Sequence, residues 1–153
     1  MLDEKSKVAT GLVVSRLPAG PSMAFKMTSS MLSADIEGHG NATTHVPEIF
    51  LNGFSTRLGR RVGRLIASLF PRQAEHEGRR LATFHNQRDF IFFRQHRYIF
   101  ADDGKRVRLQ ELGPRFTLKL KWVLDGVADV KGGAYEWFHK RHRMETSRRK
   151  FNL

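Results

Sequence analysis

The sequence predicts an α/β fold of the α+β kind, in which helices pack on a mixed, largely antiparallel sheet. Three observations predict it. Several short segments alternate apolar and polar residues between turn residues, which is typical of strands. Residues 57–70 have helical periodicity. The 153 residues, with 40% hydrophobic content, suffice for one domain with a core but not comfortably for two.

The first elements are a predicted hairpin over residues 11–28. Residues 11–17 are largely apolar, residues 18–21 (PAGP) form a strong turn signal, and alternate positions in residues 22–28 are apolar. We expect a short helix around residues 30–37, then a loop, and a strand over residues 48–52.

Residues 57–70 are the strongest helix prediction, with Ser55 or Thr56 as N-cap and Pro71 ending the helix. One side is apolar, formed by Leu58, Val62, Leu65, Ile66 and Leu69, and the other side is a stripe of Arg57, Arg60, Arg61 and Arg64. Gly59 and Gly63 lie beside the apolar side, where we expect them to allow close packing of the helix on the sheet.

A meander of strands is predicted next, over residues 81–85, 90–100, 107–112 and 116–124, with turns at 86–89, 102–104 and 113–114. If the last two strands pair with matching faces, one exposed surface carries Arg106, Arg108, Lys119 and Lys121. Like charges facing across strands are destabilising. An anionic partner explains this pattern, whereas stability does not.

The strand pattern weakens after Gly126, with an aromatic patch at Tyr135 and Trp137. We expect residues 139–150 to be extended or disordered alone, and either to order on RNA or to serve as a nuclear-import signal. This basic segment contains Lys140, Arg141, Arg143, Arg148, Arg149 and Lys150.

The formal net charge of +12 is concentrated in one part of the chain. Residues 1–56 carry four basic and five acidic side chains, whereas residues 57–153 carry 23 basic and ten acidic ones. A solvated surface usually intersperses the two signs, so this asymmetry favours a nucleic-acid partner. No apolar run approaches the roughly 18 residues of a membrane span, and residues 1–5 do not resemble a secretory signal. We therefore expect a soluble intracellular protein.

Two further groups are candidates for RNA contact. Arginines at a helix N-terminus oppose the helix dipole, but together with free backbone N–H groups they suit a phosphate; the alternative is a solvated face. Residues 83–98 mix aromatic rings with groups that bond to bases. From this stretch we select Arg88, Arg94, His96 and Arg97, and we expect Asp89 to pair with Arg88 in the turn.

No catalytic residue, metal site or cofactor is predicted. The absence of cysteine excludes disulfides and thiolate chemistry. His85 and His96 could approach across the hairpin, and His139 and His142 are three residues apart, but neither pair has a third ligand nearby. Asp102 and Asp103 are explained by a turn with Gly104.

Several of these motifs resemble the Brix-domain proteins of eukaryotic ribosome biogenesis. They are residues 47–54 (PEIFLNGF), Leu58-Gly59, residues 69–71 (LFP), residues 83–98 (TFHNQRDFIFFRQHRY) and residues 113–120 (GPRFTLKL). Residues 135–137 (YEW) and 144–151 (METSRRKF) look like the large-subunit branch of that family.

The resemblance implies a non-catalytic, nucleolar factor that binds pre-rRNA of the large (60S) subunit and works with a dedicated assembly-factor protein, without membrane or small-molecule substrate. It also implies a domain of two α/β halves similar to an anticodon-binding domain. Against that pattern, residues 1–47 are expected to be a remnant of the first half, residues 48–130 the second half, and residues 131–153 a basic tail.

Two alternatives remain open at the level of sequence. The chain could be chiefly a protein-interaction module that docks on an acidic assembly factor, with RNA contact incidental. It could also be an RNA-cleaving enzyme that uses His85 or His96, a hypothesis that rests on those histidines alone.

Overall fold

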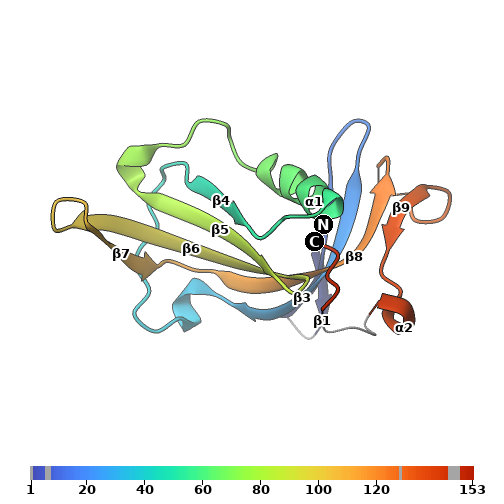
Figure 1. Cartoon of the computed structure of the whole chain (residues 1–153). Helices are drawn as coiled ribbons and strands as arrows, with labels where there is room; N and C mark the ends of the chain where they lie inside the picture. The colour runs from blue at the N-terminus through green and yellow to red at the C-terminus, as the bar shows by residue number, and fades with distance from the viewer. Residues whose placement is uncertain (1, 6–7, 128, 145–148) are drawn as a thin grey trace.

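Strand pairing organises the molecule around the helix α1 (Arg57–Ala67). In the computed structural model, which describes residues 2–5, 8–127, 129–144 and 149–153, nine strands form one sheet that curves around α1 (Figure 1). The strands are β1 (Leu2–Lys5), β2 (Val8–Ser15), β3 (Ser22–Met31), β4 (Glu48–Asn52), β5 (Arg80–Gln87), β6 (Phe90–Ala101), β7 (Arg106–Glu111), β8 (Arg115–Asp125) and β9 (Ala134–Phe138). The helical elements are α1 (Arg57–Ala67), α2 (Arg141–Met144) and the short 3₁₀ turns η1 (Ser33–Asp35) and η2 (His76–Gly78).

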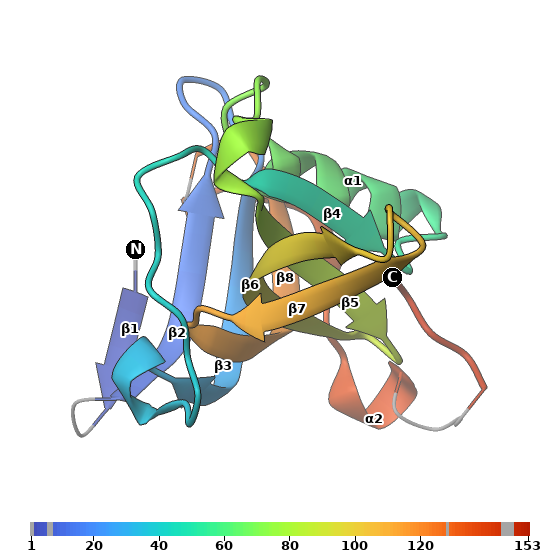
Figure 2. The ribbon, with the colours of Figure 1, turned by 90° about the vertical axis from the view of Figure 1, so that its left-hand side faces the viewer.

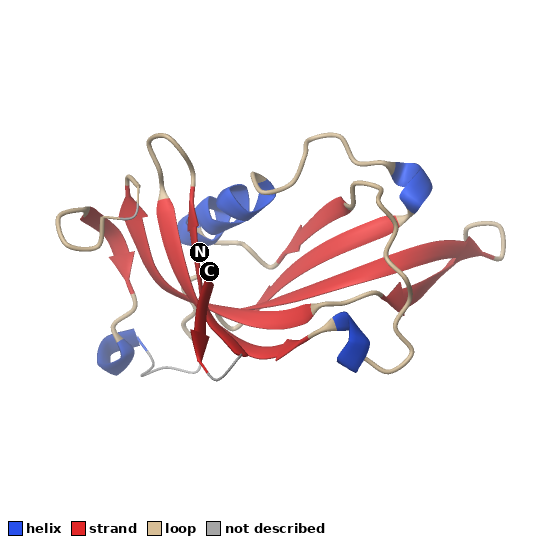
Figure 3. Ribbon diagram, turned by 180° about the vertical axis from the view of Figure 1, so that it is seen from behind, coloured by secondary structure: helices blue, strands red, loops and turns tan. Residues whose placement is uncertain are grey.

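The sheet order is β1-β2-β3-β8-β6-β5-β4, with β7 added to β6 and β9 added to β8. The pairing of β4 with β5 is parallel, and the other pairings are antiparallel. Seen from behind, the strands form a continuous curved surface with α1 against one face (Figure 3). The predicted fold class is confirmed.

The core lies between α1 and the face of the sheet that it covers. From the helix, Val62, Leu65 and Ile66 are buried. They share one apolar cluster with buried side chains of four strands, among them Met23, Phe25, Phe84, Ile91, Phe93, Leu118 and Leu120. A row of rings crosses this core, in which Phe84 and Phe93 lie 4.8 Å apart and Phe93 and Phe116 lie 4.5 Å apart between centroids.

The predicted hairpin of residues 11–28 and the strand over residues 48–52 are confirmed as β2–β3 and β4. The short helix predicted around residues 30–37 is confirmed only as the 3₁₀ turn Ser33–Asp35, because β3 continues to Met31, which pairs with Arg115 of β8. The helix predicted to reach residue 70 ends at Ala67. Proline disfavours helical backbone conformation in the residue before it, so the helix ends before it reaches Pro71.

The hairpin predicted between residues 107–112 and 116–124 is also wrong. β8 lies between β3 and the first half of β6, while β7 pairs with the second half of β6. β7 and β8 therefore follow one another along the same edge of the long strand β6. The reason is burial: β8 contributes Leu118, Leu120, Val123 and Leu124 to the interior, and a strand at the centre of a sheet needs a partner on each side.

The C-terminal residues return to the core. Leu153 is buried in the apolar cluster, and its backbone N–H and that of Asn152 donate to Asp89 Oδ1 at 2.9 and 2.7 Å. Thr56, at the start of α1, donates from its hydroxyl to the backbone oxygen of Asn152 at 2.6 Å. Asp89 thus binds Asn152 and Leu153 rather than Arg88, and it does so from the tight turn between β5 and β6.

Candidate nucleic-acid interface

The arginine stripe predicted on residues 57–64 is confirmed in geometry. α1 starts at Thr56, whose hydroxyl oxygen accepts a hydrogen bond from Gly59 N at 2.9 Å, which is a normal N-cap. Gly59, Val62, Gly63, Leu65 and Ile66 are buried, whereas the four arginines of the stripe are exposed. The sequence periodicity therefore fixes which side of the helix carries the charge.

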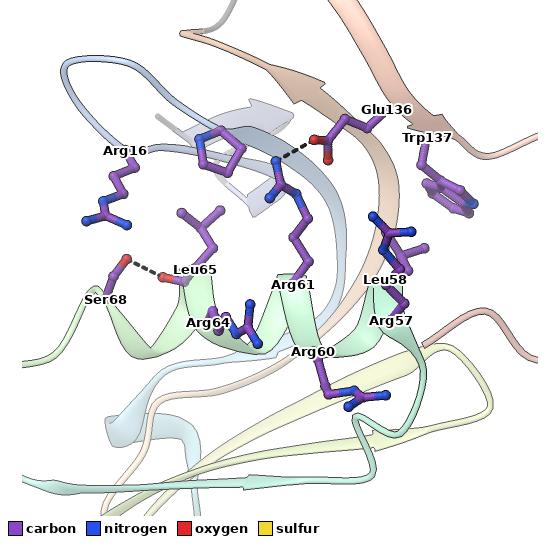
Figure 4. A pocket seen from close by; sticks show the side chains of 11 residues that line it. Arg16, Arg57, Leu58, Arg60, Arg61, Arg64, Leu65, Ser68, Glu136 and Trp137 are labelled. Atoms are coloured by element: carbon purple, nitrogen blue, oxygen red, sulfur yellow. Dashed lines mark hydrogen bonds and ion pairs between the residues drawn. The ribbon is translucent and has the colours of Figure 1, made fainter.

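A concave region of about 1060 Å³, here called the arginine groove, lies between α1, the loop joining β2 to β3, and β9 (Figure 4). Its lining comprises Arg16 and Pro21 from the loop, Arg57, Leu58, Arg60, Arg61, Arg64, Leu65 and Ser68 from α1 and its C-cap, and Glu136 and Trp137 from β9. Five cations and one acid thus line the same surface.

The ion pair within the groove divides its arginines into two kinds. Arg61 donates to Glu136 Oε1, and both side chains are partly exposed. Among the residues that the structure describes, Arg16, Arg57, Arg60 and Arg64 form no salt bridge. In Figure 4 Arg16 approaches the helix from the β2–β3 loop, while Arg60 points away from Glu136. Positive charge without a counter-ion therefore remains along the helix.

One backbone N–H at the start of α1 already has a partner. Thr56 occupies Gly59 N, and the C-terminal residues lie against this end of α1, where a Cβ on Gly59 would stand 2.7 Å from the carbonyl carbon of Leu153. The arginines that line the groove are exposed, so their guanidinium groups are open to a ligand. Thr56 occupies one backbone N–H, and the expectation that the other N–H groups share in anion binding stays a prediction.

Arg16 and β9 were missed by the sequence reasoning. Arg16 stands in the part of the chain with slightly negative net charge, and only the fold places it opposite α1. β9 carries Glu136 and Trp137, and the alternation of Ala134–Phe138 is a weak strand signal that was available. The side of the groove formed by these two segments depends on long-range pairing of β9 with β8 and of β2 with β3.

The candidates of residues 83–98 are dispersed. Arg88 is exposed in the β5–β6 turn, and Arg97 is exposed on β6. Arg94 is half-buried, with Nη1 donating to Phe93 O at 2.7 Å and Nε 3.9 Å from Glu111 Oε1. His96 lies across from Glu111 of β7, and burial, with a smaller effect of Arg94, lowers its pKa against the opposing effect of Glu111. The lowered pKa favours the neutral imidazole, which is a hydrogen-bonding group rather than a cation.

The single basic surface predicted for β7 and β8 is not formed. Arg106 and Arg108 pair with Ala101 and Ile99, whereas Lys119 pairs with Phe90. Successive residues of a strand point to opposite faces, so Lys119 lies on the other face from the two arginines. Arg106 Nε lies 3.3 Å from Asp102 Oδ2, Lys119 Nζ lies 5.1 Å from the centre of the Phe90 ring, and Lys121 and Arg108 are exposed.

The basic C-terminal candidates are exposed where they are described. Lys140, Arg141 and Arg143 belong to or precede α2, which replaces the extended conformation expected there, and Arg149 and Lys150 precede the buried Leu153. Arg148 lies outside the described residues. The residues proposed for RNA contact therefore form several separate groups, of which the α1 stripe lines the large arginine groove.

The paired histidines of the enzymatic alternative are separated. His85 pairs with Phe92 and His96 with Leu81, four positions further along β5, which is roughly 13 Å. No cluster of three or more His, Cys, Asp or Glu side chains suited to a metal ion occurs in the described part of the chain. None of the helices within the described ranges is both long and apolar enough to cross a membrane.

Comparison with known proteins gives a consistent result. The family model described as the Brix domain matches residues 1–122. Ribosome production factor 1 of Danio rerio is 54% identical over 154 residues, which cover 100% of this chain and 46% of that protein. The same-named proteins of Mus musculus and Saccharomyces cerevisiae are 55% and 48% identical, with 100% of this chain aligned to 44% and 50% of their lengths. The chain thus spans about half the length of the curated relatives it matches.

Proposed function

The chain belongs to the Brix-domain family, and on that premise we propose that it is a non-catalytic ribosome assembly factor that binds pre-rRNA of the large (60S) subunit in the nucleolus. The printed names of the relatives, ribosome production factor 1, support the assembly role. The strongly basic composition of residues 57–153 supports RNA as the ligand.

The observation that carries the RNA proposal is the arginine groove. Four of its five arginines form no salt bridge among the described residues, although self-repulsion makes such an arrangement unfavourable in an isolated protein. Guanidinium groups bind phosphate through paired N–H donors, and RNA offers a regular series of phosphates. Residues 83–98 and the segment around α2 supply further exposed cations outside the groove.

The proposal includes a dedicated protein partner within pre-60S particles. The same basic surfaces would serve an acidic assembly factor if RNA contact were incidental. The two possibilities differ in whether binding of RNA depends on the arginines of the groove. RNA binding depends on phosphate contacts and releases counter-ions in proportion to their number.

The test is a triple variant, Arg57→Gln/Arg60→Gln/Arg64→Gln, which spares the Arg61–Glu136 ion pair. Affinity for a single-stranded RNA of about 20 nucleotides is measured over a range of salt concentrations. Losing three phosphate contacts should weaken binding and make the slope of log K against log salt less negative by about 2.

The matched control is Arg72→Gln/Lys105→Gln/Lys131→Gln, which removes the same charge at exposed positions away from the groove. It should change the slope far less. Equal effects of the two variants would mean that only net charge matters, and an unchanged affinity of the groove variant would reject the groove as the RNA site.

A further inference from the structure

In the described part of the chain, the outer edge of β7 in the β6–β7 hairpin pairs with no other strand. The hairpin forms one end of the sheet, and β7 lies at the front when the molecule is viewed from that end (Figures 1 and 2). β7 pairs with β6 on one side, and residues 106–110 are all exposed. On its other side, the hydrogen bond seen among the described residues is from Gly40 N to Glu111 O, 2.8 Å long, at the very end of the strand.

That bond fixes which backbone groups of β7 face outward. In an antiparallel ladder alternate residues turn both their N–H and their C=O to the same side. Since the Glu111 carbonyl points away from β6 and Leu112 N donates to Gln95 O of β6 at 2.8 Å, the backbone groups of Val107 and Leu109 point outward. The edge therefore offers two donors and two acceptors in strand geometry.

The side chains of the hairpin separate by chemistry. On one face Val107 and Leu109 are 53% and 58% exposed and pair with Phe100 and Tyr98, of which Phe100 is 58% exposed. On the other face Arg106 and Arg108 pair with Ala101 and Ile99. Large apolar side chains at this exposure on a protruding strand mark an interaction surface.

We propose that the outer edge of β7 binds an extended segment of a partner protein as an added strand, and that acidic and apolar residues alternate in that segment. The apolar residues of the segment lie beside Val107 and Leu109, and its acidic residues lie beside Arg106 and Arg108. This mode combines main-chain hydrogen bonds, which give affinity, with alternate side chains, which give specificity. It goes beyond RNA binding, since it uses a different surface and a different ligand.

The charge pattern favours an acidic, alternating partner segment over a second copy of the chain and over RNA. A second copy of the chain pairing through β7 would set arginines against arginines on one face, which is destabilising. RNA would use Arg106 and Arg108, but it would leave Val107, Leu109 and the outward backbone groups without suitable partners. An acidic, alternating strand satisfies both faces and the edge.

The experiment uses a fluorescently labelled peptide in which Glu and Val alternate, with binding to the whole chain followed by anisotropy. Two comparison peptides have the same composition: one with Glu and Val in separate blocks, and one N-methylated at alternate backbone nitrogens. The alternating peptide should bind, and both comparison peptides should bind at least about tenfold more weakly. Hydrogen exchange at the Val107 and Leu109 amides should slow when the alternating peptide is bound.

Two variants test the surface itself. Val107→Pro removes an outward N–H but none that faces β6, and proline is tolerated on edge strands. It should weaken peptide binding about tenfold, whereas Val107→Thr, which keeps the N–H and the branched side chain, should weaken it less. Arg106→Glu/Arg108→Glu should also weaken binding. Circular dichroism checks that each variant keeps the fold.

Three results would overturn the proposal. The first is equal binding of the blocked and alternating peptides, since charge alone would then explain it. The second is a chain that dimerises through β7, shown by a dimer in sedimentation that Val107→Pro abolishes. The third is an RNA that binds the hairpin, with its affinity reduced by Arg106→Glu/Arg108→Glu but not by Val107→Pro, while the peptide does not bind.

Discussion

At the scale of single residues, His96 shows how the sheet sets the charge of a side chain. It is half-buried on β6, with Glu111 across from it on β7 and Arg94 two residues before it. Burial lowers the pKa of His96 below the ordinary value of 6.5. The folded chain therefore holds this proton less tightly than the unfolded chain does.

This difference predicts a pH dependence of stability. A group whose pKa is depressed by folding contributes stability above its unfolded pKa, and that stability is lost as the pH falls through the folded pKa. The free energy of unfolding, measured with urea between about pH 7.5 and about pH 5.5, should decrease toward acid. The decrease should be smaller in His96→Gln. The same substitution at exposed His142 serves as the control, and an equal effect of both would contradict the assignment to His96.

Two residues mark the limit of prediction at this scale. Asp89 was placed correctly in a turn, because Arg88 and Asp89 adopt left-handed backbone with φ of 53° and 65° in a tight hairpin. Its partners, Asn152 and Leu153, are 63 and 64 residues away in sequence. Arg16 joins the arginine groove by a similarly distant contact. Local composition contains no information about either pairing.

At the scale of elements, α1 depends on two glycines with different surroundings. A Cβ on Gly63 would meet Leu51 Cδ1 at 3.5 Å, which is ordinary contact. A Cβ on Gly59 would meet the backbone of Leu153 at 2.7 Å and that of Phe54 at 3.3 Å. The predicted role of the glycines in packing the helix on the sheet is therefore wrong for Gly59, which allows close approach of the C-terminal segment instead.

The two glycines should respond oppositely to the same substitution. Gly63→Ala should stabilise the chain by up to about 1 kcal/mol, because alanine is the better helix former and space exists for its methyl group. Gly59→Ala should destabilise it by about 1–2 kcal/mol, because backbone must move to relieve the overlap. Denaturant midpoints measure both. A stabilising Gly59→Ala would show that Leu153 does not lie against the helix.

Strand positions were predicted well where a periodic pattern was present, and strand partners were not. β4, β6 and β8 were found within one or two residues of their bounds, because alternation is a local property. The turn signal at Gly113-Pro114 was interpreted as a hairpin, although β7 and β8 instead share β6 as neighbour. Neighbour choice depends on which strand buries the most apolar surface, which a pattern within one strand does not reveal.

At the scale of the whole molecule, the net charge of +12 opposes folding through self-repulsion. Raising NaCl from about 0.02 M to about 0.2 M should screen that repulsion and raise the midpoint of thermal unfolding by a few degrees. Because four arginines lie within eight residues of α1, the variant Arg57→Gln/Arg60→Gln/Arg64→Gln should show a smaller rise than Arg72→Gln/Lys105→Gln/Lys131→Gln. Differential scanning fluorimetry measures the rise, and the reverse order would show that the groove is not the main site of repulsion.

The attachment of Asn152 and Leu153 beside α1 also changes what the basic residues after β9 can do. Lys140 lies two residues after β9, and Lys150 lies two residues before Asn152, which is bound to Asp89 and Thr56. Basic residues held next to fixed elements sample fewer arrangements than residues on a free arm. A polyanion that binds them therefore removes less conformational entropy. This restraint also shortens the distance that Lys140, Arg141 and Lys150 can reach. They can therefore contact only ligands that already lie close to the body of the molecule.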